Sequence, residues 1–200
     1  MIAIIDYGMG NLSSVQKAAE FLGGRSRIIS SPGDLYKADK IIFPGVGAFG
    51  DAVRELKKRA LDHAIKRMLC QEIPFLGICL GLQVLFESSE ESAKTKGLGL
   101  LQGRVKRFRG KIKVPHMGWN NLRNMNKACP LLKGVGDNAY VYFCHSYYVE
   151  PVDKSIAAAS TDYGRDFTSI VWRENLFGLQ FHPEKSQKVG LRILENFVRL

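Results

Sequence analysis

The sequence lacks the features of a membrane or secreted protein. No stretch of its 200 residues approaches the roughly 18 consecutive apolar residues that a membrane-spanning helix needs. The opening Met-Ile-Ala-Ile-Ile-Asp-Tyr-Gly has neither the basic leader nor the long apolar region of a secretion signal. We therefore expect a soluble, cytoplasmic protein with no membrane partner.

Cysteine is scarce, and its spacing argues against two kinds of site. The four cysteines, Cys70, Cys79, Cys129 and Cys144, form no Cys-x-x-Cys pair. Neither a zinc ribbon nor a disulfide framework is indicated, so reduced thiols are expected. We predict no metal site and no bound cofactor.

Acidic residues are also in short supply, since 19 Asp and Glu face 29 Lys and Arg, for a net charge of +10. The densest positive stretch, residues 104–113, is interrupted by apolar residues at the spacing of a twisted hairpin. We favour a solvated hairpin face. A docking surface is the second interpretation and nucleic-acid binding the third, because a charge run alone carries little specificity. No nucleic-acid partner is predicted.

The first half of the chain alternates short apolar runs with longer amphipathic segments. This alternation is typical of βαβ units and of a parallel sheet that is covered on both faces. Strands are predicted at residues 2–5, 27–30, 41–43 and 74–78, and helices at residues 12–22 and 50–69.

The second half has the short strands and turn signals of an antiparallel arrangement. Strands are predicted at residues 140–144, 156–160, 169–172 and 176–181, and a closing helix at residues 186–200. No repeat or linker marks a second domain. We predict one α/β domain over residues 1–200, with a mixed sheet that is parallel at its core, antiparallel at one edge and flanked by helices.

Cys79 lies between two glycines, in Gly77-Ile-Cys-Leu-Gly, where an apolar strand gives way to a helix predicted at residues 80–87. The pattern is that of a nucleophile elbow with sulfur in place of oxygen. Such a turn needs glycine because the nucleophile's backbone is strained and the strand and helix approach closely. The other interpretation is a small buried thiol, as free cysteines usually are. The pentapeptide alone does not decide between the two.

A cysteine nucleophile needs a base and a group that orients it. His182 ends a predicted apolar strand and precedes Pro183 and Glu184. In an extended chain residues i and i+2 share a face, so Glu184 can lie beside the imidazole and hydrogen-bond one ring nitrogen. Both groups would lie at the carboxyl end of their strand, as Cys79 does, and ligands of open α/β sheets bind there. Of the other histidines, we expect His63 on the surface and His145 in a pocket wall.

An acyl-transfer site also needs backbone N–H groups for an oxyanion. The glycine-rich residues 44–47 follow the predicted third strand, next to that of Cys79, and Leu80 offers a second amide. An ordinary glycine-rich turn is the competing interpretation. The combination suits thiolate attack on a carbonyl, departure of a leaving group protonated by His182, and hydrolysis of the thioester.

Several stretches carry a family resemblance. This chain resembles the class I glutamine amidotransferases in three stretches: Pro44-Gly-Val-Gly-Ala-Phe-Gly, Gly77-Ile-Cys-Leu-Gly-Leu-Gln and His182-Pro-Glu-Lys-Ser. Members of that family hydrolyse the side-chain amide of glutamine to release ammonia. A narrower group, the glutaminase subunits of imidazole glycerol phosphate synthase, is similar in Asp6-Tyr-Gly-Met-Gly-Asn, Val114-Pro-His-Met-Gly-Trp-Asn and Tyr142-Phe-Cys-His-Ser-Tyr-Tyr. These stretches run from residue 6 to residue 186 and so cover essentially the whole chain.

The resemblance implies a flavodoxin-like three-layer fold and a role for each matching residue. Cys79 would be the nucleophile, His182 the general base and acid, and Glu184 the carboxylate that orients it. The remaining implied roles are oxyanion donation by Val46, Gly47 and Leu80, and contact with L-glutamine by Gly45, Gln83, Ser146 and Tyr147.

The resemblance also implies a heterodimer. Ammonia would pass to a separate (βα)8-barrel synthase subunit. That subunit would use it on its nucleotide ligand, a phosphorylated ribulosyl substrate, to make imidazole glycerol phosphate and AICAR in histidine biosynthesis. Asn11, Trp119 and Lys185 lie in segments that resemble the docking surface of the family. Each also has a plainer interpretation: Asn11 as a helix N-cap, Trp119 as core and Lys185 as a surface charge.

Three alternatives stay open at this point. One is the glutaminase of another pathway, such as anthranilate or pyridoxal phosphate synthesis, against which Pro115-His-Met-Gly-Trp-Asn argues. Another is a cysteine peptidase or amidase on a related sheet, and the third is a binding module in which Cys79 is merely buried.

Overall fold

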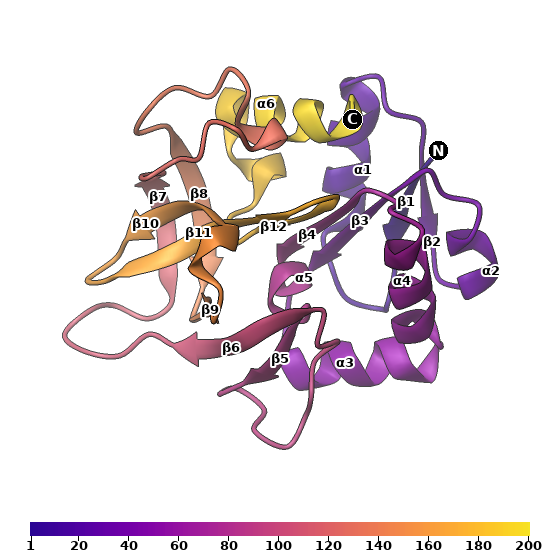
Figure 1. Ribbon diagram of the computed structural model, residues 1–200, viewed down its shortest axis with the longest axis horizontal. Helices are drawn as coiled ribbons and strands as arrows, with labels where there is room; N and C mark the ends of the chain where they lie inside the picture. The colour runs from indigo at the N-terminus through magenta and orange to yellow at the C-terminus, as the bar shows by residue number, and fades with distance from the viewer.

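The protein is described by a computed structural model of residues 1–200, in which one large sheet takes strands from most of the chain (Figure 1). Its ten strands follow the order β2-β1-β3-β4-β12-β11-β9-β6-β5, with β10 paired to β11. Their bounds are β1 Ile2–Ile5, β2 Ser26–Ile29, β3 Lys40–Gly45, β4 Phe75–Cys79, β5 Phe86–Ser89, β6 Leu101–Arg107, β9 Tyr147–Pro151, β10 Ala157–Asp162, β11 Asp166–Arg173 and β12 Leu176–Leu179.

The sheet is parallel from β2 to β12 and antiparallel through β12, β11, β9 and β6. The predicted mixed sheet, with a parallel core and an antiparallel side, is therefore confirmed. A separate antiparallel pair, β7 (His116–Asn121) and β8 (Tyr140–His145), stands at the end of the molecule farthest from β2 (Figure 1).

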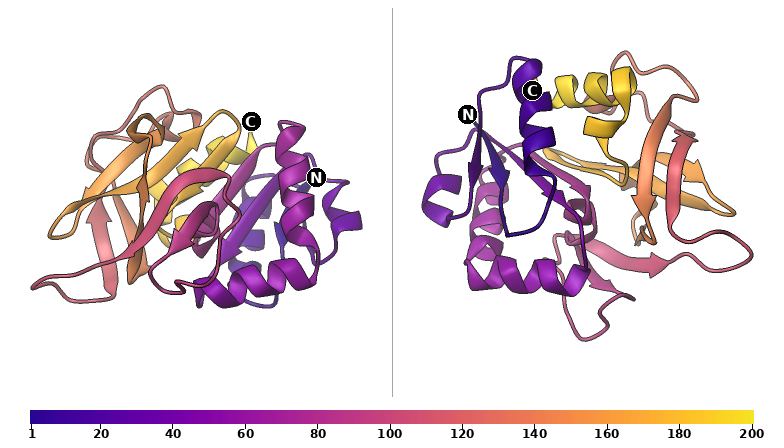
Figure 2. Two further views of the ribbon diagram at one scale, coloured as in Figure 1. Left: turned by 60° about the horizontal axis from the view of Figure 1, so that its bottom comes forward. Right: turned by 180° about the vertical axis from the view of Figure 1, so that it is seen from behind.

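Helices cover the parallel half on both faces (Figures 1 and 2). Their bounds are α1 Leu12–Phe21, α2 Pro32–Leu35, α3 Phe49–Lys58, α4 Leu61–Cys70, α5 Leu80–Gln83 and α6 Gln187–Val198. Successive strand residues point to opposite faces, so Ile5 and Phe43 share one hydrophobic cluster with α3 and α4, while Ile4 and Ile42 share another with α1 and α6. The result is three layers around two cores.

One predicted helix is in fact two. The amphipathic segment 50–69 divides at Ala60, whose φ of 55° is left-handed and cannot continue a right-handed helix. The apolar spacing runs through the break because Leu56 and Leu61 are both buried against the same side of the sheet. The predicted strands 2–5, 27–30, 41–43 and 74–78 correspond to β1–β4 within two residues at either end.

The basic segment 104–113 is not a hairpin, contrary to expectation. Its first part belongs to β6, which pairs with β5 and β9, and residues 108–115 form a loop. The reason is Phe108, which turns inward and packs on Tyr148 and Phe167 instead of lying along a hairpin face.

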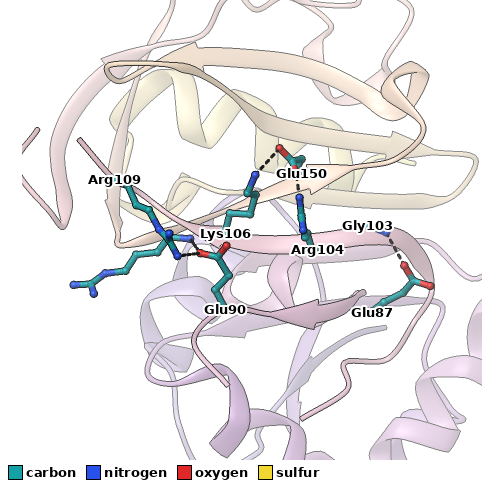
Figure 3. Close-up of polar contacts among 8 residues, drawn as sticks. Glu87, Glu90, Gly103, Arg104, Lys106, Arg109 and Glu150 are labelled. Atoms are coloured by element: carbon teal, nitrogen blue, oxygen red, sulfur yellow. Dashed lines mark hydrogen bonds and ion pairs between the residues drawn. The ribbon is translucent and has the colours of Figure 1, made fainter. Parts of the chain in front are cut away.

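Acidic side chains pair with three of the six cations in that segment (Figure 3). Glu150 accepts hydrogen bonds from Arg104 Nε and Lys106 Nζ, each at 3.2 Å. Glu90 pairs with the Arg109 guanidinium at 3.2 Å. These ion pairs agree with the solvated-face interpretation of the segment. None of the helices has both the length and the apolar content that crossing a membrane requires.

Candidate active site

The site forms where the ends of three neighbouring parallel strands meet. In the register of the sheet Gly45 of β3 lies opposite Cys79 of β4, and Ile78 lies opposite Leu179 of β12. The chain that leaves β12 carries His182. Three segments far apart in sequence thus reach one edge of the sheet, as their strand positions predicted.

Cys79 sits on a strained turn. Its φ of 54° and ψ of −105° are unfavourable for any residue with a side chain. The flanking glycines permit this turn, because a Cβ on Gly81 would lie 1.8 Å from the Phe43 carbonyl oxygen and one on Gly77 would lie 2.6 Å from that of Gly81. The strained elbow predicted from Gly77-Ile-Cys-Leu-Gly is confirmed.

The helix after the elbow is shorter than expected. The sequence predicted a helix continuing to Glu87, but α5 ends at Gln83 and Phe86 begins β5, where it pairs with Leu101. A single turn has little macrodipole. The electrostatic surroundings of Cys79 therefore come chiefly from neighbouring side chains.

His182 and Glu184 form a buried pair. His182 Nδ1 lies 3.0 Å from Glu184 Oε1, and the two side chains are 6% and 2% exposed. Burial lowers the pKa of His182, but its contacts with Cys79 and Glu184 and the negative charges of both outweigh burial and raise that pKa to about 10. The imidazole is accordingly protonated at neutral pH.

The route to this pair differs from the one predicted. β12 ends at Leu179, and residues 183–185 form a 3-10 turn that starts with Pro183, so Glu184 does not reach His182 along an extended strand. Proline fixes the backbone for the first position of such a turn. The turn brings the Glu184 carboxylate back to within hydrogen-bond distance of the His182 imidazole.

A cavity of about 310 Å³ opens beside Cys79. This volume is within the usual range of small-molecule sites, roughly 300–1,000 Å³. The sequence-predicted site residues that line it are Val46, Gly47, Cys79, Leu80, Gln83, Ser146, Tyr147, His182 and Lys185. His145 lines it too, as expected, along with Glu91, Pro115 and Cys144.

The glycine-rich end of β3 forms one wall. Gly47 has a φ of +94°, and Val46 is 42% exposed. The Tyr7 hydroxyl donates a hydrogen bond of 3.2 Å to the Val46 carbonyl. Gly45 does not line the cavity, because it faces the Tyr7 hydroxyl and Leu80 Cβ, each within 3 Å of where its own Cβ would be.

The opposite wall is tied together through Tyr147. Gln83 Nε2 donates to the Tyr147 carbonyl at 3.0 Å and to Gln180 Oε1 at 3.4 Å. Gln180 Nε2 in turn lies 3.8 Å from Cys79 Sγ. Gln83 is therefore a structural link as well as a lining residue.

Sequence reasoning missed Glu91. Its Oε2 accepts a hydrogen bond of 2.6 Å from the Phe49 amide, and it lines the cavity with Gln83 and Lys185. The local sequence Ser-Ser-Glu-Glu-Ser gave no sign of this position, because the contact spans 42 residues. Glu91 supplies the lining with a carboxylate that can attract a cationic group.

The three residues assigned to a docking surface take different positions. Trp119 is 47% exposed, packs edge-on against Tyr142 and borders a shallow hollow beside the start of α6, so it is not core. Asn11 occupies the N-cap position of α1 but makes no side-chain capping hydrogen bond. Lys185 is exposed at the rim of the cavity.

Comparison with known proteins identifies the family. The model of the family "Glutamine amidotransferase class-I" matches residues 3–200. This chain belongs to the class I glutamine amidotransferases. Among relatives of this amidotransferase, "Imidazole glycerol phosphate synthase subunit HisH" of Syntrophotalea carbinolica is 50% identical over 98% of both chains. The protein of the same name from Methanocaldococcus jannaschii is 50% identical over the full length of both.

Solved structures agree on the fold of this amidotransferase. "Crystal structure of glutamine amidotransferase" superposes with a TM-score of 0.78 at 16% identity and covers all of both chains. "Structure of PurLQS from Thermotoga maritima" does so with a TM-score of 0.79 at 18% identity, over 99% of this chain and 97% of that one. The flavodoxin-like three-layer fold is thus confirmed.

Proposed function

We propose that this chain is the glutaminase subunit of imidazole glycerol phosphate synthase, hydrolysing L-glutamine to glutamate and ammonia. One observation carries the chemistry: a cysteine held at a positive φ shares its cavity with a buried histidine that a glutamate orients at 3.0 Å. That is the arrangement of a nucleophile, its base and an orienting group.

The first half-reaction forms a thioester. Cys79 Sγ attacks the side-chain carbonyl carbon of glutamine, and the carbonyl oxygen becomes an oxyanion. The Leu80 amide, unpartnered within its own helix because it is in the first turn, faces that oxygen together with amides of Val46 and Gly47. His182 then gives its proton to the departing nitrogen, and ammonia leaves.

The second half-reaction releases glutamate. Water takes the position that ammonia vacated, and the now neutral His182 accepts its proton as the oxygen attacks the thioester. Glu184 stabilises the imidazolium that forms in this step and holds the ring in one orientation. Collapse of the intermediate expels the Cys79 thiolate, which restores the starting state.

Substrate binding uses the remaining lining residues. Glu91 faces the α-ammonium group of glutamine, for which a carboxylate is the complementary charge. Lys185 at the rim carries the charge that complements the α-carboxylate. Gln83, Ser146 and Tyr147 complete the opposite wall.

Ammonia is delivered to a (βα)8-barrel synthase subunit on another polypeptide. The docking surface includes Trp119, whose exposed ring is typical of interface anchors, together with Asn11 and Lys185. We place the complex in the cytoplasm, where the phosphorylated intermediates of an amino-acid pathway are found.

The direct test measures glutamine hydrolysis by the purified chain with and without the barrel subunit and its nucleotide ligand. Wild type should release ammonia much faster in the complex, and Cys79→Ala should release none while still binding the partner. Hydrolysis by Cys79→Ala would refute the nucleophile. A full rate in the isolated chain, unaffected by the barrel, would refute the synthase assignment.

A further inference from the structure

We propose that Asn120, His116 and His145 form a fixed hydrogen-bond chain that positions the Tyr147 carbonyl and, through it, the Gln83 amide of the glutamine cavity. Its catalytic consequence rests on the proposed glutaminase function. The chain of bonds itself does not. All three would be positioning residues that act through Tyr147 and Gln83.

The hydrogen-bond chain from Asn120 to Tyr147 is continuous in the structure. Asn120 Nδ2 lies 3.4 Å from His116 Nε2, His116 Nδ1 lies 3.1 Å from His145 Nε2, and His145 Nδ1 lies 2.7 Å from the Tyr147 carbonyl oxygen. His116 is 3% exposed and His145 5%. The bonds therefore run through a buried region and end at the cavity wall.

Only one assignment of protons satisfies every contact. A carbonyl oxygen can only accept, so His145 Nδ1 carries its proton, and Nε2 of the neutral ring is an acceptor. His116 Nδ1 must then carry its own proton and donate it to that acceptor. His116 Nε2 is left to accept from the Asn120 amide.

The asparagine at the start is also fixed. Asn120 Nδ2 donates at 2.8 Å to the Asp162 carbonyl, and Asn120 Oδ1 accepts from the Asn121 amide at 2.8 Å. Turning the amide over would set oxygen against oxygen and nitrogen against nitrogen. A cationic His145 would likewise force His116 Nε2–H to face the Asn120 donor.

The surroundings favour the neutral form of both rings and pack His116 between aromatic side chains. His116 stacks between Tyr163, with ring centroids 3.9 Å apart, and Phe143, at 4.7 Å. Burial lowers the pKa of His116 to about 4 and, together with the charges of His116 and His182, that of His145 to about 3, although its bond to Tyr147 opposes the shift. Among the titratable groups near the pair, Tyr163 stacks on His116, and the charge of His182 opposes protonation of His145. Neither ring is hydrogen-bonded to a carboxylate that would favour an imidazolium.

The last bonds of this hydrogen-bond chain determine which atom of Gln83 is left free to contact the substrate. The Tyr147 carbonyl accepts from both His145 Nδ1 and Gln83 Nε2, which uses both of its lone pairs. The Gln83 amide hydrogens are committed to Tyr147 and Gln180. Gln83 therefore offers Oε1, an acceptor, to a substrate whose amide and ammonium groups are donors.

The first test is spectroscopic and needs no substrate. The full chain, labelled with ¹⁵N-histidine, is titrated by NMR, and His116→Asn and His145→Asn assign the signals. We expect both rings to be neutral with the proton on Nδ1, and to stay so down to about pH 5, well below the ordinary histidine pKa of about 6.5. An Nε2-protonated ring, or an imidazolium at pH 6, would overturn the proposal.

The second test uses two substitutions at one position. Asparagine at 145 can place an N–H where His145 Nδ1 lies, whereas leucine cannot. With the synthase subunit present, His145→Leu should raise KM for glutamine about tenfold with a smaller change in kcat, and His145→Asn should restore most of the loss. Equal KM values for the two variants would contradict the positioning role.

The two tests separate the possible failures. If His145→Leu does not fold, the proton positions in wild type still decide whether the chain of bonds exists. If wild type in the complex does not hydrolyse glutamine, the proposed function fails while the NMR result is unaffected.

Discussion

Among single residues, the proposed reaction depends on the directions in which a few polar atoms point. Cys79 owes its exposure to the cavity to an unfavourable backbone conformation, and His182 owes its proton to two negative partners. Such strain is sustained only when the surrounding packing fixes it. A suitable test removes one polar atom that orients the site and leaves the surrounding packing intact.

Tyr7 provides that test. Its hydroxyl holds the Val46 carbonyl at 3.2 Å, and because the peptide group is planar and trans, the Gly47 N–H points the opposite way. Tyr7→Phe removes only the hydroxyl, so the peptide is freed to turn. We expect kcat for glutamine hydrolysis in the complex to fall about tenfold, with KM little changed.

Tyr36→Phe is the matched control, because Tyr36 is 44% exposed and its ring stacks on Arg67. It should leave kcat at the wild-type value. If Tyr7→Phe also kept the wild-type kcat, the hydroxyl would have no part in orienting the Val46–Gly47 peptide.

The elbow depends on the close packing of α5 against the paired strands β3 and β4. Gly81 of α5 lies so close to β3 that a Cβ would be 1.8 Å from the Phe43 carbonyl oxygen. Phe43 is held in the middle of the sheet by pairing with β4. Neither backbone segment can move apart without breaking hydrogen bonds between the central strands β3 and β4.

Gly81→Ala should therefore destabilise the fold severely. We expect the free energy of unfolding in urea to fall by about 3 kcal/mol or more. Gly33→Ala in α2 is the control, since no atom lies within 4 Å of the added methyl group and no positive φ is required. Equal stability of the two variants would show that the elbow is less tightly packed than described.

The parallel strands and the elbow are predictable from the sequence. Apolar runs locate β1, β3 and β4, because strands buried on both faces read as continuous hydrophobic stretches. The glycines around Cys79 and the His182-Pro-Glu184 sequence then identify the elbow and the paired histidine. Each of these features depends on neighbouring residues in the chain.

What escaped prediction depends on contacts between distant residues. The break at Ala60 is compatible with an uninterrupted apolar stripe, and Phe108 turns inward to meet aromatic partners from β9 and β11. Glu91 is held beside the cavity by a hydrogen bond from the Phe49 amide, and a 3-10 turn at Pro183 replaces the extended segment expected between His182 and Glu184. No local pattern specifies these contacts.

At the scale of the whole molecule, three buried histidines make stability depend on pH in two opposing ways. The folded pKa values of His116 and His145, about 4 and 3, lie below the ordinary 6.5, mainly because of burial. The unfolded chain therefore binds more protons as pH falls below 6.5, and stability declines. His182, raised to about 10 against the effect of burial, contributes stability that is complete below 6.5 and lost as pH rises towards 10.

The free energy of unfolding should consequently peak near pH 6.5. Each histidine can change it by at most about 1.4 kcal/mol per pH unit within its window. Urea unfolding between pH 4.5 and pH 9 measures the curve, and His63→Asn, which alters an exposed ring, should reproduce it. A curve that stays level between pH 4.5 and pH 6.5 would contradict the buried, neutral state of His116 and His145.

The proposed reaction requires Cys79 to form a covalent γ-glutamyl thioester, and isolating that intermediate tests the requirement. The chain, in complex with the synthase subunit and nucleotide ligand, is mixed with L-glutamine, quenched in acid during turnover and analysed by peptide mass spectrometry. We predict a γ-glutamyl group on the peptide containing Cys79, in wild type and in Cys70→Ala, and none in Cys79→Ala. Ammonia release without that adduct, or an adduct on another cysteine, would contradict the role of Cys79 as the nucleophile.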